Sequence, residues 1–125
     1  MKVILFTTLL LFSINGFAQY WKKVGESEFG TSFYIDVDNI RKHNGFVYYW
    51  MLDELPKPIA TVNSKIQKYK VDCGEEKTTS LTDTWYSQSM GKGKVLVETF
   101  PNEVEHPKPN TVGFVFMKFA CDYFK

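Results

Sequence analysis

Cysteine is the residue type whose number and position most directly suggest chemistry in this chain. The 125 residues include two, Cys73 and Cys121. In an exported protein, two cysteines are expected to form one disulfide bond, and two free thiols are the alternative. A bond between them would close a loop of about 49 residues, which stabilises a fold by roughly 4 kcal/mol in the chain-entropy model.

The other residues that could bind a metal or catalyse a reaction are scattered. His43 and His106 both lie in predicted turns, and no Cys, Asp or Glu surrounds them at the spacing of a zinc site. The segment 90–94 (MGKGK) lacks the glycine spacing and the Ser/Thr after lysine that a phosphate loop needs, so it is predicted to be a turn. We therefore expect neither a metal nor a cofactor.

Five carboxylates lie in or beside predicted strands, where an acid–base pair could form. They are Asp36, Asp38, Asp53, Glu54 and Asp72. Carboxylates so distributed are typical of the rim of a sheet, and no histidine is placed to work with them. The chain also lacks a Gly-x-Ser-x-Gly elbow and a cysteine–histidine signature. We predict that the protein is not an enzyme.

The first residues have the order of a secretory signal peptide. Lys2 precedes an apolar run over 3–14, and the small residues Gly16 and Ala18 precede a cleavage point at Gln19. The run is shorter than the roughly 20 apolar residues of a membrane span. The sequence therefore predicts a signal peptide over 1–18 and one domain over 19–125. We expect export to the periplasm, the medium or the cell surface, without a lipid anchor, since no cysteine follows the cleavage point.

The balance of charges argues against nucleic acid as a partner. Removal of residues 1–18 takes away Lys2, one of 15 basic residues, and leaves their number equal to the 14 acidic ones. Nucleic-acid-binding domains carry a basic excess.

Six strands and one helix are predicted from the hydrophobic pattern. The strands are expected at 20–25, 32–37, 45–55, 64–73, 77–88 and 94–100, and the helix at 110–125. Pro56 and Pro58 are expected to end the third strand, because proline cannot donate to the ladder. Asn110 or Thr111 is expected to cap the helix.

These elements indicate an α+β fold in which a six-stranded antiparallel sheet carries the C-terminal helix on one face. The Cys73–Cys121 disulfide would tie the helix to the sheet. The third strand is apolar on both faces, with Phe46, Tyr48, Trp50 and Leu52 alternating with Val47, Tyr49 and Met51. We expect Trp50 to be buried with Phe116 and Phe119 under the helix.

Aromatic residues are abundant, with 11 Phe, 7 Tyr and 3 Trp. If Trp50 faces the helix, the opposite face carries a candidate recognition surface. Its residues would be Tyr34, Tyr49, Met51, Tyr86, Lys68 and Lys70. Tyrosine, methionine and a few cationic side chains are typical of recognition surfaces, although a partly solvated sheet face with scattered aromatics is the alternative. If the tyrosines are instead buried under the helix, the binding surface is to be sought among Phe46, Tyr48 and Trp50.

The chain also resembles the surface-adhesin protein E family of bacterial secreted proteins. The matching features are, in chain order, Trp21, Tyr34-Ile35-Asp36, Ile40, Gly45, Val47, Trp50, Pro58, Ser64, Val71-Asp72-Cys73, Tyr86-Ser87, Met90-Gly91-Lys92-Gly93, Pro109-Asn110-Thr111 and Cys121. The resemblance implies a six-stranded antiparallel sheet whose concave side holds the C-terminal helix through the disulfide. It also implies a bacterial adhesin that binds host matrix or plasma proteins.

Three hypotheses about function follow. The first is a secreted or surface-associated bacterial binding protein, an adhesin for a host protein. The second is a periplasmic module that binds another bacterial protein or itself, in which case a homodimer is expected. The third is a carrier of a small apolar ligand held between helix and sheet.

Overall fold

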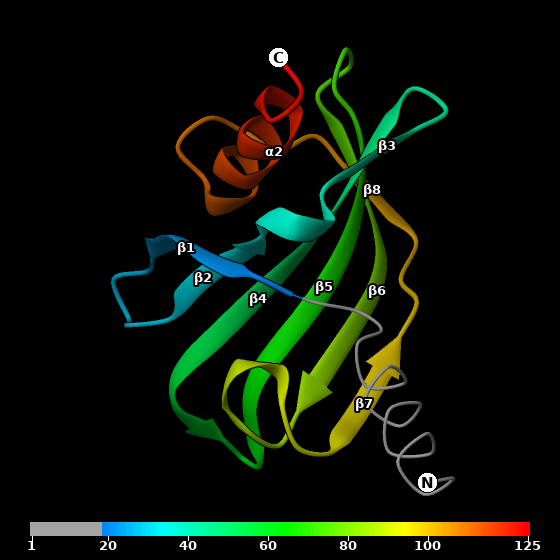
Figure 1. Cartoon of the computed structure of the whole chain (residues 1–125). Helices are drawn as coiled ribbons and strands as arrows, with labels where there is room; N and C mark the ends of the chain where they lie inside the picture. The colour runs from blue at the N-terminus through cyan, green and yellow to red at the C-terminus, as the bar shows by residue number, and fades with distance from the viewer. Residues whose placement is uncertain (1–18) are drawn as a thin grey trace, which may run out of the picture.

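One antiparallel sheet and one helix make up the part of the chain that the computed structural model describes, residues 19–125. The predicted signal peptide lies outside these residues. The main path of the sheet has the strand order β1-β2-β4-β5-β6-β7 (Figure 1). These strands are β1 (Trp21–Glu26), β2 (Ser32–Asp36), β4 (Phe46–Ile59), β5 (Val62–Asp72), β6 (Lys77–Tyr86) and β7 (Val95–Thr99).

The six predicted strands correspond to this main path, and the predicted antiparallel sheet with a C-terminal helix is confirmed. Two short strands were not predicted: β3 (Arg41–His43) pairs with β4, and β8 (Glu103–Glu105) pairs with β6. Two 3-10 turns, η1 (Val37–Asn39) and η2 (Ser89–Gly91), lie between strands.

Strand β4 differs from the prediction because it continues through Pro56 and Pro58. Its pairing with β5 is interrupted between Glu54 and Ile59, so the two prolines lie where the ladder needs no N–H donor. The pairing resumes only at Ile59, opposite Val62.

The helix α2 (Val112–Asp122) begins where the sequence predicts. The Thr111 hydroxyl accepts a hydrogen bond from the Phe114 N–H at 3.2 Å, which satisfies one free donor of the first turn. The buried residues of α2 are Phe116, Met117 and Ala120, whereas Val115 is 47% exposed. Phe119, which the sequence also predicts to be buried, is half-buried and packs against the edge of the core.

The core lies between α2 and one face of the sheet, and aromatic rings occupy its centre. Tyr49 of β4 is 1% exposed, and its ring stacks on Tyr69 of β5 and on Phe116, with centroids 5.3 and 6.2 Å apart. Phe33 meets Phe116 edge to face at 6.5 Å. The expectation that Trp50 joins this core is wrong, because Trp50 alternates with Tyr49 and points to the other side of the sheet.

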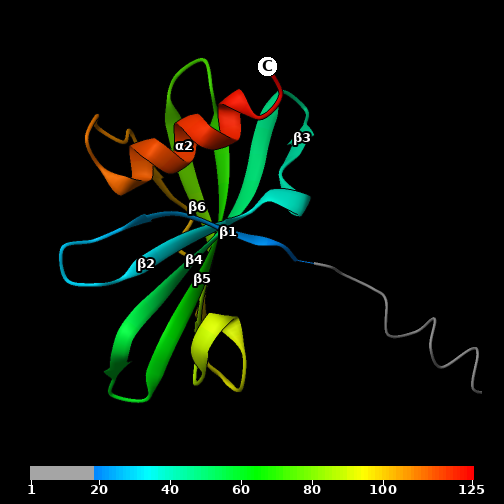
Figure 2. The same ribbon diagram turned by 60° about the vertical axis from the view of Figure 1, so that its left-hand side comes forward.

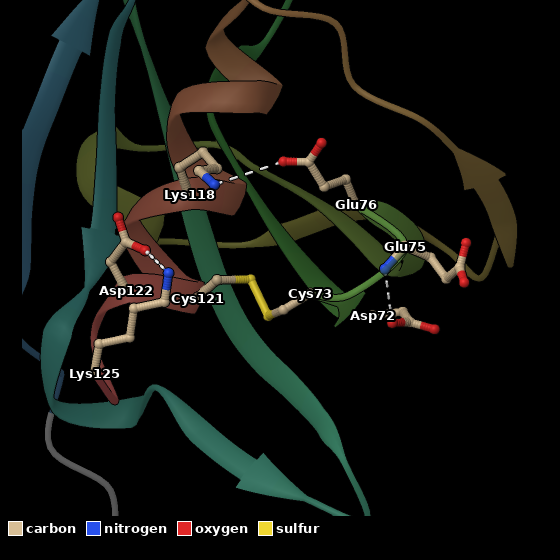
Figure 3. The surroundings of a disulfide bond; sticks show 8 residues. All are labelled: Asp72, Cys73, Glu75, Glu76, Lys118, Cys121, Asp122 and Lys125. Carbon is tan, nitrogen blue, oxygen red and sulfur yellow. Dashed lines mark hydrogen bonds and ion pairs between the residues drawn. A yellow bond between two sulfur atoms is a disulfide. The ribbon is translucent and has the colours of Figure 1, made fainter.

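A disulfide between Cys73 and Cys121 confirms the predicted pairing and joins the end of β5 to the last turns of α2 (Figure 3). Two ion pairs lie beside it. Lys118 is 3.6 Å from Glu76 of the β5–β6 turn, and Lys125 is 3.1 Å from Asp122. These pairs are exposed and contribute little, so the covalent bond is the main attachment of the helix end.

Substitution of Phe116 tests the packing. We expect Phe116→Ala to lower the free energy of unfolding by roughly 3–5 kcal/mol, because it removes a buried aromatic ring from the core. Urea unfolding followed by circular dichroism would measure the change. Val115→Ala, on the exposed side of the same helix, should change the stability by less than about 1 kcal/mol. Equal losses in the two variants would contradict this packing.

Reduction of the disulfide should lower the free energy of unfolding by roughly 4 kcal/mol, because Cys73–Cys121 restrains a long loop of the unfolded chain. Urea unfolding with and without a phosphine reductant would measure this difference. The Cys73→Ala/Cys121→Ala double variant should be insensitive to the reductant. Two titratable thiols in denatured, unreduced, exported protein would show that the bond does not form.

Candidate functional site

The sheet face opposite α2, called the far face below, carries a row of aromatic rings and lysines. Phe46, Tyr48 and Trp50 are alternate residues of β4 and are half-buried. In the pairing of β4 with β5, Tyr48 lies opposite Lys70 and Trp50 lies opposite Lys68. Residues directly opposite each other in an antiparallel pair lie on the same face, so the lysines flank the rings. We call these five residues the aromatic–lysine strip.

The ammonium groups of the strip lie on the aromatic rings. Lys68 Nζ is 5.1 Å from the Trp50 ring centroid and 5.9 Å from that of Tyr48, and Lys70 Nζ is 4.1 Å from the Phe46 centroid. Such contacts hold the lysine stems against the rings while the charge stays accessible to solvent. The strip therefore presents flat apolar surface and positive charge together.

Strand β3 extends the positive charge at one side of the strip. Arg41 pairs with Tyr48, and His43 pairs with Phe46. The Arg41 guanidinium donates to the Asp38 backbone oxygen at 2.8 Å and to Asn39 Oδ1 at 3.2 Å, which orients it. Among residues 19–125, no ion pair involves Lys68, Lys70 or Arg41. The nearest carboxylate along β5, Asp72, lines a hollow together with Phe46 and Lys70 but forms no ion pair with Lys70.

The turn η2 covers the part of the far face that lies beside the strip, over Leu52 and Ile66. Ser64 Oγ donates to the Gln88 backbone oxygen at 2.7 Å and accepts from the Gly91 N–H at 2.8 Å. Gly91 has φ of +69°, and a Cβ there would lie 2.5 Å from Ile66 Cδ1. Because η2 lies this close, Leu52 and Ile66 are buried although they face away from α2.

The predicted recognition residues are divided between the two faces. Lys68, Lys70, Tyr34 and Tyr86 lie on the far face, since Tyr34 pairs with Leu52 and Tyr86 pairs with Ser64. Tyr34 and Tyr86 are half-buried, and β4 and β5 separate their strands.

The expectation that Tyr49 and Met51 are exposed is wrong, because both face α2 and are buried. Burial, together with the neighbouring Tyr69, raises the pKa of Tyr49 well above its ordinary value. The far face instead presents Phe46, Tyr48 and Trp50, the surface named as the alternative if the strand were inverted.

Three of the five carboxylates singled out in the sequence accept hydrogen bonds from backbone N–H groups. Asp36 is fully buried and accepts from Tyr20 N and Asp38 N at 3.1 and 3.2 Å, which holds η1. Glu54 accepts from Met90 N at 3.0 Å and from the Ser89 hydroxyl, and Asp72 accepts from Glu75 N at 3.2 Å. These groups stabilise turns.

His43 and His106 are both exposed in the structure, His43 on β3 and His106 after β8. Within residues 19–125, no three His, Cys, Asp or Glu side chains come together as metal ligands. In the same part of the chain, no helix has the length and apolar character needed to cross a membrane.

Comparison with known proteins identifies the fold and the family. Residues 21–122 match the family model of the surface-adhesin protein E. No curated protein matches the chain. Crystal form II of Haemophilus influenzae protein E is 18% identical, with a TM-score of 0.64, and the match covers 88% of this chain and 94% of that one.

Two further structures of that protein give similar results. One is 17% identical with a TM-score of 0.63 over 86% of this chain and 87% of that one. Protein E from non-typeable H. influenzae is 17% identical with a TM-score of 0.53 over 86% and 88%. At these identities the likeness concerns the fold, whereas the family match spans nearly all of residues 19–125. The chain belongs to the surface-adhesin protein E family.

Proposed function

We propose that this protein is an exported, non-enzymatic binding protein of the adhesin type, which attaches to a protein of a host's matrix or plasma. The aromatic–lysine strip is the proposed contact surface. The observation that carries this proposal is that Lys68 and Lys70 lie over the half-buried rings of Phe46, Tyr48 and Trp50 and form no ion pair among residues 19–125.

The composition of the strip suits an acidic protein surface. Aromatic rings contribute contact area at a low cost in side-chain entropy, and they are enriched where binding energy concentrates. The lysines would attract acidic groups, steer the encounter, and make it sensitive to salt. Membership in a family named for surface adhesion supports a partner outside the cell.

The carrier hypothesis has less support from the packing. It requires free space between helix and sheet, but Tyr49, Phe116 and Met117 fill the middle of that interface and are each 1% exposed. The periplasmic module remains the alternative, because it would use the same strip for a bacterial partner.

The place where the protein acts separates the adhesin from the periplasmic module. We expect the mature protein to begin at Gln19, because residues 1–18 have the pattern of a signal peptide. Fractionation of the native cells and intact-mass measurement would test this. An adhesin should be recovered at the cell surface or in the medium. Recovery only from the periplasm would favour the module, and retention of residues 1–18 would contradict the proposed export.

Charge reversal on the strip tests the contact surface. We expect Lys68→Glu/Lys70→Glu to weaken binding to immobilised mammalian plasma or basement-membrane extract by at least about fivefold, the equivalent of about 1 kcal/mol. The control is Lys57→Glu/Lys108→Glu, which makes the same change of net charge at two exposed positions away from the strip. Binding of the unmodified protein should fall as salt rises.

An equal loss in both variants would show that only net charge matters, and no loss in either would place the contact elsewhere. Trp50→Leu separates the ring from the charge, because it keeps an apolar side chain and should weaken binding without changing its salt dependence.

A further inference from the structure

The face of the sheet that carries α2 has an uncovered hollow. The helix lies over the end of the sheet near the β5–β6 turn, and the β4–β5 turn lies at the opposite end (Figure 2). A hollow of about 210 Å³ lies toward that uncovered end. Its lining residues are Asp53, Leu55, Ile59, Val62, Lys65 and Trp85.

Three of the lining residues form a row across neighbouring strands. Asp53 of β4 lies opposite Lys65 of β5, and Lys65 lies opposite Trp85 of β6. All three therefore point to the same face as Tyr49 and the helix. The row combines a carboxylate, an ammonium group and an indole ring in one short stretch of surface.

Asp53 is the carboxylate of this row, and one of its two oxygens lacks a hydrogen-bond donor. Its Oδ1 is buried and has no hydrogen-bond donor among residues 19–125. Burial raises the pKa of Asp53 to about 6, while the positive charge of Lys65 lowers it and Asp83 raises it. Near neutral pH the group is mostly ionised, and a buried acceptor without a donor costs free energy until a donor reaches it.

Lys65 shows that a cation fits against the Trp85 ring at the side of the hollow, and its ammonium group also lies near Asp83. Its Nζ lies 4.8 Å from the Trp85 ring centroid and 3.9 Å from Asp83 Oδ2. Asp83 also accepts a hydrogen bond from Gln67 Nε2 at 3.2 Å. Asp53 lines the hollow, and its Oδ1 lacks a donor from residues 19–125 that a group entering the hollow would supply.

The rest of the hollow is apolar. Leu55, Val62 and Ile59 line it from the β4–β5 hairpin, and Ile59 is 68% exposed. A ligand that matches this surface has an aliphatic stem and a positively charged head with several N–H donors. The arginine side chain has both, and its planar guanidinium also stacks on aromatic rings, which an ammonium group cannot do.

We propose that this hollow binds an arginine side chain of a protein partner, with its stem against Leu55 and Val62 and its guanidinium donating to Asp53 beside Trp85. The site lies on the face opposite the aromatic–lysine strip and has the opposite preference for charge. It is independent of the proposed function, because none of its residues belongs to the strip.

Titration with a small peptide tests the site directly. The probe is acetyl-Gly-Arg-Gly-amide, followed by two-dimensional NMR of the ¹⁵N-labelled mature protein, with the Trp85 indole N–H as reporter. We expect saturable shifts confined to the hollow, with a dissociation constant in the millimolar range, as for a single side chain. The analogue with leucine in place of arginine should bind at least about fivefold more weakly, because it cannot donate to Asp53.

Two substitutions should act in opposite directions. Asp53→Asn keeps the shape but removes the negative charge, and it should weaken arginine binding at least about fivefold. Lys65→Met removes the competing cation from Trp85 and should tighten binding. Asp72→Asn is the matched control, because this carboxylate lies near the β5–β6 turn and accepts from Glu75 N. Lys68→Glu/Lys70→Glu should leave arginine binding unchanged, which separates this site from the strip.

Acidification should release the peptide. The charged and titratable groups facing Asp53 are Lys65, Asp83 and Tyr69. The guanidinium keeps its charge throughout, so binding should weaken as pH falls from about 7.5 to about 5 and Asp53 gains its proton. Asp53→Asn should remove most of this dependence.

Three results would overturn the proposal. The first is the absence of saturable binding at about 50 mM peptide, a concentration well above a millimolar dissociation constant. The second is arginine binding that Asp53→Asn does not change. The third is preferential binding of acetyl-Gly-Glu-Gly-amide that is lost in Lys65→Met, which would make the hollow an anion site.

Discussion

The stacking of Phe116 in α2 on Tyr49 in β4 is the contact on which both faces of the sheet depend. Side chains of a strand alternate between faces, so one buried residue determines the direction of all the others. With Tyr49 beneath the helix, Val47 and Met51 join the core, and Phe46, Tyr48 and Trp50 must point away from it. The Cys73–Cys121 disulfide holds the helix at the end of the sheet where β5 turns into β6.

The two faces consequently have opposite character. On the far face, η2 covers Leu52 and Ile66 but leaves the aromatic–lysine strip half-buried, with its two ammonium groups lying over the rings. On the helix face, α2 leaves the β4–β5 end uncovered, and the unpartnered Asp53 lies in the hollow that results. A net charge of +1 conceals this separation, because the charges nearly balance over the chain.

The acidic residues illustrate how carboxylate side chains take different roles in one fold. Asp36, Glu54 and Asp72 each accept a backbone N–H and thereby stabilise η1, η2 and the β5–β6 turn. Asp53 precedes Glu54 in β4 but points to the opposite face of the sheet, where no N–H of residues 19–125 donates to its Oδ1. Asp53 Oδ1 is therefore buried without a hydrogen-bond donor at the hollow near the β4–β5 turn.

Local patterns in the sequence determined the six main strands and the start of the helix, because strands and helix ends depend on neighbouring residues. The number of cysteines, two, determined their pairing. The sequence left Asn110 and Thr111 as alternative caps, and the structure shows that Thr111 is the cap. Only the tertiary structure decided which face of β4 is buried. Between the pairs Glu54–Ser64 and Ile59–Val62, β4 carries residues 55–58 whereas β5 carries only Asn63. In an uninterrupted hairpin Trp50 would lie opposite Val71 and share its buried face. In this interval β4 thus has three residues more than β5. Side chains alternate between the two faces with a period of two, so an odd number of extra residues places Trp50 on the face opposite to that of Val71. The strip and the hollow both follow from that reversal, which no local pattern encodes.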